Sequence, residues 1–271
     1  MGNWGDLRKR ALTAALLGPL SLICVWVGGV WWAGLLGLSL LAMAWEWARL
    51  CGSTIARLPG MLMLTIALAS LVCALAGWPA EGLALALGGA VLIALAGRSY
   101  GSDRWAWLAF GAAYLGAAGV ALIFLRGDPD VGRANIIFLL AIVWSSDISA
   151  YVIGRAFGGP KLAPAISPNK TWSGAMGGLV GASLVGLVAT MLTGSWGSFG
   201  WAILVAAILG VATQAGDIFE SWMKRRFGVK DSSGLIPGHG GVLDRLDGLL
   251  AAAPMAALVG AANGATMLLW R

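Results

Sequence analysis

The chain has 271 residues, of which 59% are hydrophobic and 11% are charged, and its mean hydropathy is +0.84. Repeated apolar runs longer than a soluble core helix needs exclude an ordinary soluble domain and predict a polytopic helical membrane protein. Backbone groups in hydrocarbon must be satisfied within their own helix, so we expect an all-α fold and no sheet. The net charge of +6 is better explained by Lys and Arg at one membrane face than by nucleic-acid binding, which we do not expect.

The first predicted element is a hairpin of two helices. Residues 1–10 are basic and residues 11–45 carry no charge. A single helix of that length is too long for a bilayer at ~1.5 Å per residue, so Gly28 and Gly29 are expected to turn the chain. Without a polar break at a small-residue cleavage site, we expect this hairpin to be retained rather than removed as a signal peptide.

Further apolar segments give about nine transmembrane helices in total. They cover residues 58–78, 82–97, 105–125, 135–154, 173–193, 199–216 and 247–269. We expect residues 1–100 to hold about four N-terminal helices. Residues 101–271 are expected to form the catalytic region, with its long charged loops at 155–172 and 217–246.

The distribution of Lys and Arg predicts the orientation of these helices. With a cytoplasmic N-terminus, 15 of the 18 Lys and Arg residues fall on the inner side and three on the outer side. Positive charge accumulates on cytoplasmic loops, so this imbalance favours both the count of nine and the direction. Both long charged loops are then cytoplasmic, and so is the expected active site.

The first polar cluster interrupts the sixth predicted helix. Ser145, Ser146 and Asp147 break an apolar run, and Tyr151 and Arg155 follow. An intramembrane aspartate is expected to be functional, and an ion pair between Asp147 and Arg155 is the structural alternative.

The next polar segment, residues 167–174, is expected to be a loop that enters the seventh helix. It contains Lys170 with the hydroxyl groups of Ser167 and Thr171. Near the positive N-terminus of a helix, these groups are a candidate anion site.

The end of the eighth predicted helix carries the third cluster. If the helix continues beyond residue 216, then Gln214, Asp217, Ser221 and Lys224 lie on one face. An aspartate at the end of an apolar helix is unfavourable near lipid unless a cation neutralises it, and a divalent cation would do so. Pairing of Lys224 with Asp217 or Glu220 is the structural alternative.

A glycine-rich segment follows at residues 227–241, and it cannot continue as a regular helix. Its backbone N–H groups can approach phosphates while Lys224, Arg225 and Lys230 supply charge, although glycine richness also marks ordinary turns. His239 lies between glycines, where it contacts phosphate or nucleotide or serves as a structural hydrogen-bonding residue. A zinc role is not expected, because this is the only histidine and no suitable cysteine accompanies it.

Asp244 and Asp247 precede or open the ninth predicted helix at i, i+3 spacing. In the structural alternative Asp247 caps that helix and Asp244 pairs with Arg245 or another cation. In the functional interpretation Asp244 and Asp217 together hold Mg²⁺, which prefers oxygen ligands.

With these residues in view, the chain resembles the phosphatidate cytidylyltransferase (CDP-diacylglycerol synthase) family. The matching positions are Ser221-x-x-Lys224-Arg225, Lys230-Asp231, Pro237-Gly238-His239-Gly240-Gly241 and Asp244-Arg245-x-Asp247, together with Ser167-Pro168-x-Lys170-Thr171 and Asp147…Tyr151…Gly154-Arg155. The resemblance is detailed in the C-terminal half, whereas the first ~100 residues match only as generic spans.

The resemblance implies transfer of CMP from CTP to phosphatidic acid, with Mg²⁺ and room for a second cation. It implies metal binding by Asp217 and Asp244 and catalytic roles for these two residues with Lys170, Lys224 and Asp231. The expected substrate-binding residues are Asp147, Ser167, Thr171, Ser221, Arg225, Lys230, His239, Gly240, Gly241, Arg245 and Asp247. A homodimer in the bacterial inner membrane, in contact with membrane lipids, is expected on the same grounds.

Three other functions remain open from the sequence. A CTP-dependent polyprenol kinase or a cytidylyltransferase for another lipid phosphate keeps the nucleotide and changes the lipid. A cation-coupled transporter would use Asp147 and Asp217 as ion ligands, but it predicts charged sites near the membrane midplane rather than at one face.

Overall fold

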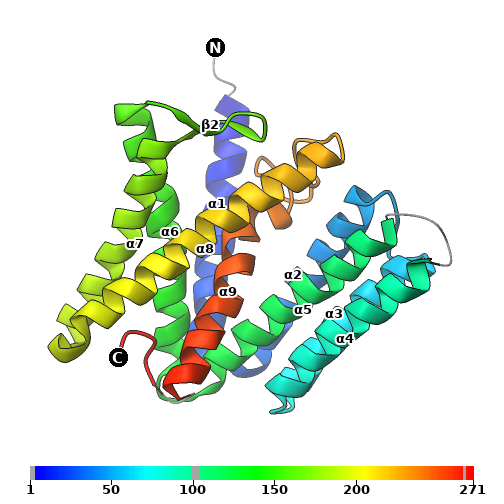
Figure 1. Cartoon of the computed structure of the whole chain (residues 1–271), viewed down its shortest axis with the longest axis horizontal. Coiled ribbons are helices and arrows are strands. Elements are labelled where there is room, and N and C mark those ends of the chain that lie inside the picture. The colour runs from blue at the N-terminus through cyan, green and yellow to red at the C-terminus, as the bar shows by residue number, and fades with distance from the viewer. Residues whose placement is uncertain (1–3, 99–103, 265–266) are drawn as a thin grey trace. The chain divides into compact units, whose positions relative to one another are not determined.

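The computed structural model describes residues 4–98, 104–264 and 267–271, and nine long α-helices make up most of them (Figure 1). The chain divides into two compact units that alternate along the sequence. The first contains residues 1–124 and 227–246, and the second contains residues 125–226 and 247–271. The division into residues 1–100 and 101–271 concerns function rather than packing, and it stays a prediction.

The first unit is built from the N-terminal helices and the glycine-rich segment. Its helices are α1 (Trp4–Val27), α2 (Gly29–Leu50), α3 (Leu58–Leu75), α4 (Pro79–Arg98) and nearly all of α5 (Arg104–Gly127). The predicted hairpin is confirmed, because α1 ends at Val27 and α2 begins at Gly29. Gly28 and Gly29 have φ of 72° and 53°, a conformation that glycine adopts readily.

An aromatic cluster forms the centre of the first unit. Trp47 of α2 is 1% exposed, and its ring stacks on Phe110 with centroids 5.9 Å apart. Its indole Nε1 donates to the carbonyl oxygen of Trp107 at 2.9 Å. Trp107 also meets the ring of Phe227 edge-on at 5.7 Å, so this cluster fixes the beginning of the glycine-rich segment.

The second unit contains the remaining helices and a short β-ribbon. Its elements are α6 (Gly132–Phe157), β1 (Lys161–Ala163), β2 (Ser167–Thr171), α7 (Trp172–Thr193), the 3₁₀ turn Trp196–Ser198, α8 (Phe199–Arg226) and α9 (Leu243–Asn263) from Asp247 onward.

Glycines bring α6 and α7 close together. A Cβ added at Gly154 would lie 3.2 Å from the Cα of Gly174, and one at Gly174 would lie 2.8 Å from the carbonyl oxygen of Ala150. Farther along, Ser145 Oγ donates to the carbonyl oxygen of Gly181 at 2.9 Å. Small residues and serine hydroxyls are the usual means of close packing between membrane helices.

Eight of the nine helices, α2 to α9, are long and apolar enough to span a membrane. In α1 the apolar stretch among the described residues is shorter, Ala15–Val27. The prediction of an all-α polytopic membrane protein is therefore confirmed.

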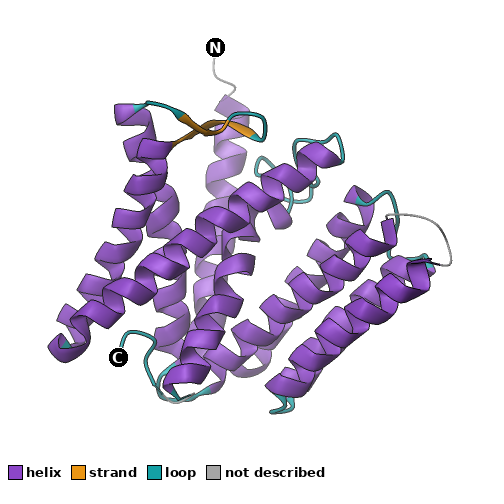
Figure 2. Cartoon of the chain, viewed as in Figure 1, coloured by secondary structure: helices purple, strands orange, loops and turns teal. Residues whose placement is uncertain are grey.

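The expectation of no sheet is wrong for one loop. Strands β1 and β2 form a short antiparallel ribbon between α6 and α7 (Figure 2). In this pairing Lys161 lies opposite Thr171 and Ala163 lies opposite Ser167. The argument against sheets concerns backbone in hydrocarbon, whereas this ribbon lies in the polar connection between two candidate spans. Residues 167–174, predicted as a loop, are thus a strand followed by the first turn of α7. Thr171 caps that helix by accepting from the N–H of Gly174 at 3.1 Å.

Candidate active site

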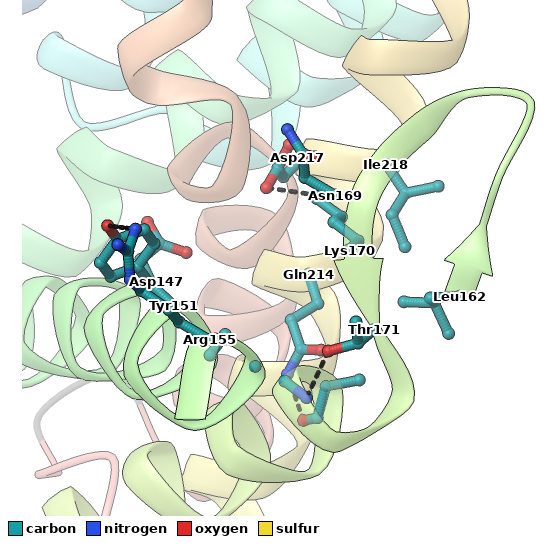
Figure 3. Close-up of a pocket in the computed structure, with 14 residues that line it drawn as sticks. Asp147, Tyr151, Arg155, Leu162, Asn169, Lys170, Thr171, Gln214, Asp217 and Ile218 are labelled. Carbon is teal, nitrogen blue, oxygen red and sulfur yellow. Dashed lines mark hydrogen bonds and ion pairs between the residues drawn. The ribbon is translucent and has the colours of Figure 1, made fainter. Parts of the chain in front are cut away.

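The second unit contains a pocket of about 570 Å³ at the end of α6 that carries the ribbon (Figure 3). Residues of α6, the ribbon, α7 and α8 line it, and charged side chains of both signs are among them. The lining comprises Asp147, Ala150, Tyr151, Gly154, Arg155, Leu162, Asn169, Lys170, Thr171, Gly174, Ala175, Gln214, Asp217 and Ile218. Three clusters predicted from separate parts of the sequence therefore meet in one cavity.

An ion pair joins the ribbon to α8 inside this pocket. Lys170 Nζ lies 2.5 Å from Asp217 Oδ2, and both side chains remain partly exposed. Ser221 Oγ donates to the other carboxylate oxygen of Asp217 at 3.5 Å. Gln214, one turn earlier on α8, donates from Nε2 to the carbonyl oxygen of Ala175 at 3.1 Å. The prediction that α8 continues past residue 216 with these side chains on one face is confirmed.

Two further carboxylates belong to the same unit. Asp147 lines the pocket, and Asp247 is close enough to interact electrostatically with Asp147, Asp217 and Lys170. Lys170 therefore pairs with Asp217 and also lies within electrostatic range of Asp247. A cavity of this composition can exchange its internal ion pair for an anionic ligand accompanied by a cation.

The basic residues around the pocket have distinct partners. Arg155 donates to the hydroxyl of Tyr151 at 3.3 Å. Arg225 donates from Nε to the carbonyl oxygen of Ile166 at 3.3 Å, which fixes the ribbon's turn to α8. Lys224 pairs with Glu220 at 2.6 Å, so the structural alternative for Lys224 is the arrangement observed.

The glycine-rich segment in the first unit is organised around Asp244. This side chain is 8% exposed, and its Oδ2 accepts from the N–H groups of Gly241 at 2.7 Å and Ser232 at 3.0 Å. The Oγ of Ser232 lies 3.1 Å from the same oxygen. Gly240 has φ of 86°, and the isolated bridge between Ile236 and Gly240 closes the loop. The segment is non-helical, as predicted.

The structural alternative in which Asp247 caps α9 is wrong. The helix begins at Leu243, so Asp244 lies in its first turn and Asp247 lies inside the helix rather than at its cap. Asp244 accepts from backbone N–H groups of its own segment, and its pairing with a cation stays a prediction. Glu46 supplies the acceptors for the first N–H groups of α9.

Glu46 of α2 is the residue that the sequence did not reveal. It is 0% exposed and accepts from the N–H groups of Val242 at 2.9 Å and Leu243 at 2.8 Å. Ser232 and Ser233 donate their hydroxyls to it at 3.2 and 2.5 Å. A lone glutamate in an apolar helix was the available signal, because a buried carboxylate needs several donors.

The predicted site residues are thus distributed over both compact units. Asp147, Ser167, Lys170, Thr171, Asp217, Ser221, Lys224, Arg225 and Asp247 belong to the second, whereas Lys230, Asp231, His239, Gly240, Gly241, Asp244 and Arg245 belong to the first. In the first unit, Lys230 and Asp231 are exposed. His239 Nδ1 is buried without a hydrogen-bond partner among the described residues.

The side chains that could bind a metal ion favour an open site rather than a closed one. Within the described ranges, no group of three or more acidic, histidine or cysteine side chains has the arrangement of a closed metal site. Magnesium usually takes only one or two carboxylates and completes its shell with water and substrate phosphates. Asp217, partly exposed in a polar pocket, fits that requirement.

Comparison with known proteins supplies the family. A model of the cytidylyltransferase family matches residues 8–262. The phosphatidate cytidylyltransferase of Brucella abortus biovar 1 (strain 9-941) is 44% identical over 260 residues, which cover 94% of each chain. That of Pseudomonas aeruginosa is 39% identical over 273 residues, covering 95% of this chain and 98% of the relative. The Haemophilus influenzae protein of the same name is 46% identical over 132 residues, 47% of this chain and 46% of the relative. The chain belongs to the cytidylyltransferase family.

Proposed function

We propose that the chain transfers CMP from CTP to phosphatidic acid, giving CDP-diacylglycerol and pyrophosphate in phospholipid biosynthesis. The observation that carries this proposal is near-full-length similarity to proteins named phosphatidate cytidylyltransferase, at 44% and 39% identity. The pocket supports it, because Lys170, Arg155 and the hydroxyl of Thr171 are groups that bind phosphate.

The chemistry requires two anions to react. An oxygen of the phosphatidate phosphate forms a bond to the α-phosphorus of CTP, and the bond from that phosphorus to the bridging β-oxygen breaks. Pyrophosphate leaves with the electron pair. Because a phosphate monoester is already an anionic nucleophile near neutral pH, no strong general base is needed, and positioning with charge stabilisation accounts for the rate.

The residues of the pocket divide these tasks. Lys170 is proposed to release Asp217 and neutralise substrate phosphate, since its ammonium group is already in the cavity. Arg155 supplies a second cation on α6, and Asn169 supplies hydrogen bonds from the ribbon. Lys224 is held by Glu220, so its charge contributes from a fixed position.

A bound Mg²⁺ would neutralise and polarise the CTP phosphates. Asp217 is the ligand that the pocket favours, with Asp147 and Asp247 as neighbouring carboxylates. The role of Asp244 as a ligand rests on the family resemblance, because its Oδ2 already accepts from two backbone N–H groups. The two aspartates are therefore proposed and tested separately.

We also propose the bacterial inner membrane as the location, a cytoplasmic face for the active site, and a homodimer. The excess of Lys and Arg on one set of loops supports the orientation, and the bacterial relatives support the membrane. The homodimer rests on the family resemblance. Accessibility of single cysteines introduced at exposed Lys161 and Asp130 to impermeant reagents tests the orientation, since these positions are predicted to face opposite sides.

The deciding experiment for the reaction uses purified protein in detergent with CTP labelled at the α-phosphate, phosphatidic acid and Mg²⁺. A lipid that carries the label, together with free pyrophosphate, is expected. Release of CDP with transfer of the γ-phosphate would instead identify a kinase. Absence of labelled lipid from a folded sample, with other lipid phosphates also tried, would overturn the proposal.

A further inference from the structure

Glu46 connects a transmembrane helix of the first unit to the glycine-rich segment. Its Oε1 faces Ser233 Oγ at 2.5 Å and the N–H of Val242 at 2.9 Å. Its Oε2 faces Ser232 Oγ at 3.2 Å and the N–H of Leu243 at 2.8 Å. All four donors lie between residues 232 and 243, so the side chain holds both ends of the segment that contains the signature glycines.

Ser232 links this glutamate to Asp244. Its Oγ lies 3.2 Å from Glu46 Oε2 and 3.1 Å from Asp244 Oδ2, while its N–H donates to Asp244 at 3.0 Å. One hydroxyl hydrogen serves two carboxylates, so moving Glu46 changes the hydrogen bonding of Asp244. Gly241 is required beside this link, because a Cβ there would overlap Ser232 Oγ and lie 2.5 Å from Glu46 Oε1.

Burying a carboxylate is unfavourable, and the hydrogen bonds that offset this for Glu46 within the described residues come from one segment. The N–H groups of Val242 and Leu243 are at the start of α9, where unpaired donors and the helix dipole favour a negative group. Asp244 follows directly in the first turn of that helix. Fixing the first N–H groups of α9 therefore fixes the backbone that carries Asp244.

We propose that Glu46 is a positioning residue for the reaction, which places the Asp244 carboxylate and the 238–241 segment. The effect of Glu46 on catalysis rests on the proposed function, because it assumes that Asp244 takes part in that reaction. The placement of Asp244 by Glu46 is a property of the fold and does not depend on the reaction. Glu46 does not touch substrate in this role; it acts through Ser232 and through the beginning of α9.

Glu46→Gln tests the positioning role directly, because a backbone N–H group faces each oxygen of the Glu46 carboxylate. Each carboxylate oxygen of Glu46 accepts from a backbone N–H, so either orientation of a glutamine amide points its NH₂ group at another donor. The matched control is Glu81→Gln, which removes the same charge from an exposed position at the start of α4. Ser232→Ala removes the link to Asp244, and Ser233→Ala removes a donor that serves Glu46 without reaching Asp244.

Two measurements are made on these variants in detergent. Amide hydrogen exchange of residues 232–246 is expected to be at least about tenfold faster in Glu46→Gln than in wild type or Glu81→Gln. The kcat for labelled-lipid formation, normalised to folded protein, is expected to fall at least about tenfold, with a smaller change in the KM for CTP, because a misplaced segment reduces turnover. Ser232→Ala is expected to lower kcat more than Ser233→Ala and to raise the Mg²⁺ concentration needed for half-maximal rate.

The outcomes separate the inference from the proposed function. Unchanged exchange and unchanged kcat in a folded Glu46→Gln protein would overturn the positioning role. If Glu46→Gln does not fold, Ser232→Ala provides the test. A Ser232→Ala protein with wild-type kcat and wild-type Mg²⁺ dependence would overturn the positioning role of Glu46. If wild type itself makes no labelled lipid, the proposed reaction fails, and the exchange measurement still confirms or rejects the positioning of the segment by Glu46.

Discussion

Lys170 Nζ lies 2.5 Å from Asp217 Oδ2, which joins a strand of the ribbon to the last turns of α8. The two residues are 47 positions apart in the sequence. Their pairing brings together a predicted anion site and a predicted metal ligand and holds both charges in the pocket. In the proposed reaction, an anionic substrate with its cation would exchange this ion pair for others rather than bury a new charge.

Lys170→Met is predicted to reduce kcat/KM by at least about a hundredfold, because it removes a preorganised cation beside the substrate phosphates. Initial rates with labelled CTP measure this effect. Lys161→Met removes an exposed lysine from the other strand of the same ribbon and is expected to retain wild-type rates. Equal rates in the two variants would contradict a role for Lys170 in phosphate binding.

Asp217→Asn and Asp244→Asn are each predicted to abolish turnover while the protein stays folded in detergent. Titration with Mn²⁺ followed by electron paramagnetic resonance provides a readout independent of activity, and Asp217→Asn is expected to weaken binding at least about tenfold. Exposed Asp130→Asn is the control. Near-full activity in either variant would reject the metal assignment of that residue.

Gly241→Ala is predicted to reduce activity at least about a hundredfold, because the added Cβ would overlap Ser232 Oγ and displace the segment that carries Asp244. Gly234→Ala lies in the same segment, where a Cβ would have no neighbour within 4 Å. Its activity is expected to match wild type. A Gly241→Ala enzyme as active as Gly234→Ala would show that the close packing at residue 241 is not needed for the reaction.

Gly174→Ala is predicted to destabilise the protein by about 1–3 kcal/mol, since its Cβ would lie 2.8 Å from the carbonyl oxygen of Ala150 on α6. Gly34→Ala in α2 places a Cβ in open space and is expected to leave stability unchanged or slightly raised. Thermal unfolding in detergent compares the two. A lower midpoint for Gly34→Ala than for Gly174→Ala would contradict the packing argument.

Burial raises the pKa of the Cys51 thiol from its ordinary value of 9.0 to about 12, and nearby Arg104 opposes part of this increase. The folded protein therefore favours the neutral thiol. The corresponding stability is fully present below about pH 9 and is lost as pH rises from 9 toward 12, because the unfolded chain ionises first. Alkylation at pH 8, read by mass spectrometry, is expected to label Cys51 only after denaturation. A Ser53→Cys variant, at a less buried position two residues along, serves as the reactive control.

Much of the fold follows from bilayer length alone. The charge-free run at residues 11–45 required a turn, and the paired glycines near its middle marked where that turn lies. The pattern of apolar runs similarly located the later helices. The ribbon was missed because strands of three and five residues, one containing Pro168, leave no alternation to detect.

Part of the site could be predicted because its residues lie close together in the sequence. The prediction was incomplete where a site residue is held by a residue far away in the sequence. Glu46 lies 186 to 197 positions from the groups it binds. The same separation explains the error at α9: its first N–H groups are satisfied by a residue from α2, so no local capping residue marked Leu243 as the start. Long-range hydrogen bonds of this kind have no signal in local composition.

The glycine contact between α6 and α7 fixes the distance between two walls of the pocket. Gly154 and Gly174 line the cavity and also set the separation of the two helices, since neither has room for a side chain. The spacing between these two walls is therefore constant unless the helices themselves move apart. The size and polarity of the pocket can still vary at other lining positions, such as Ile218, Leu162 and Asn169. These two glycines therefore set the width of the pocket, while the side chains around them set its size and polarity.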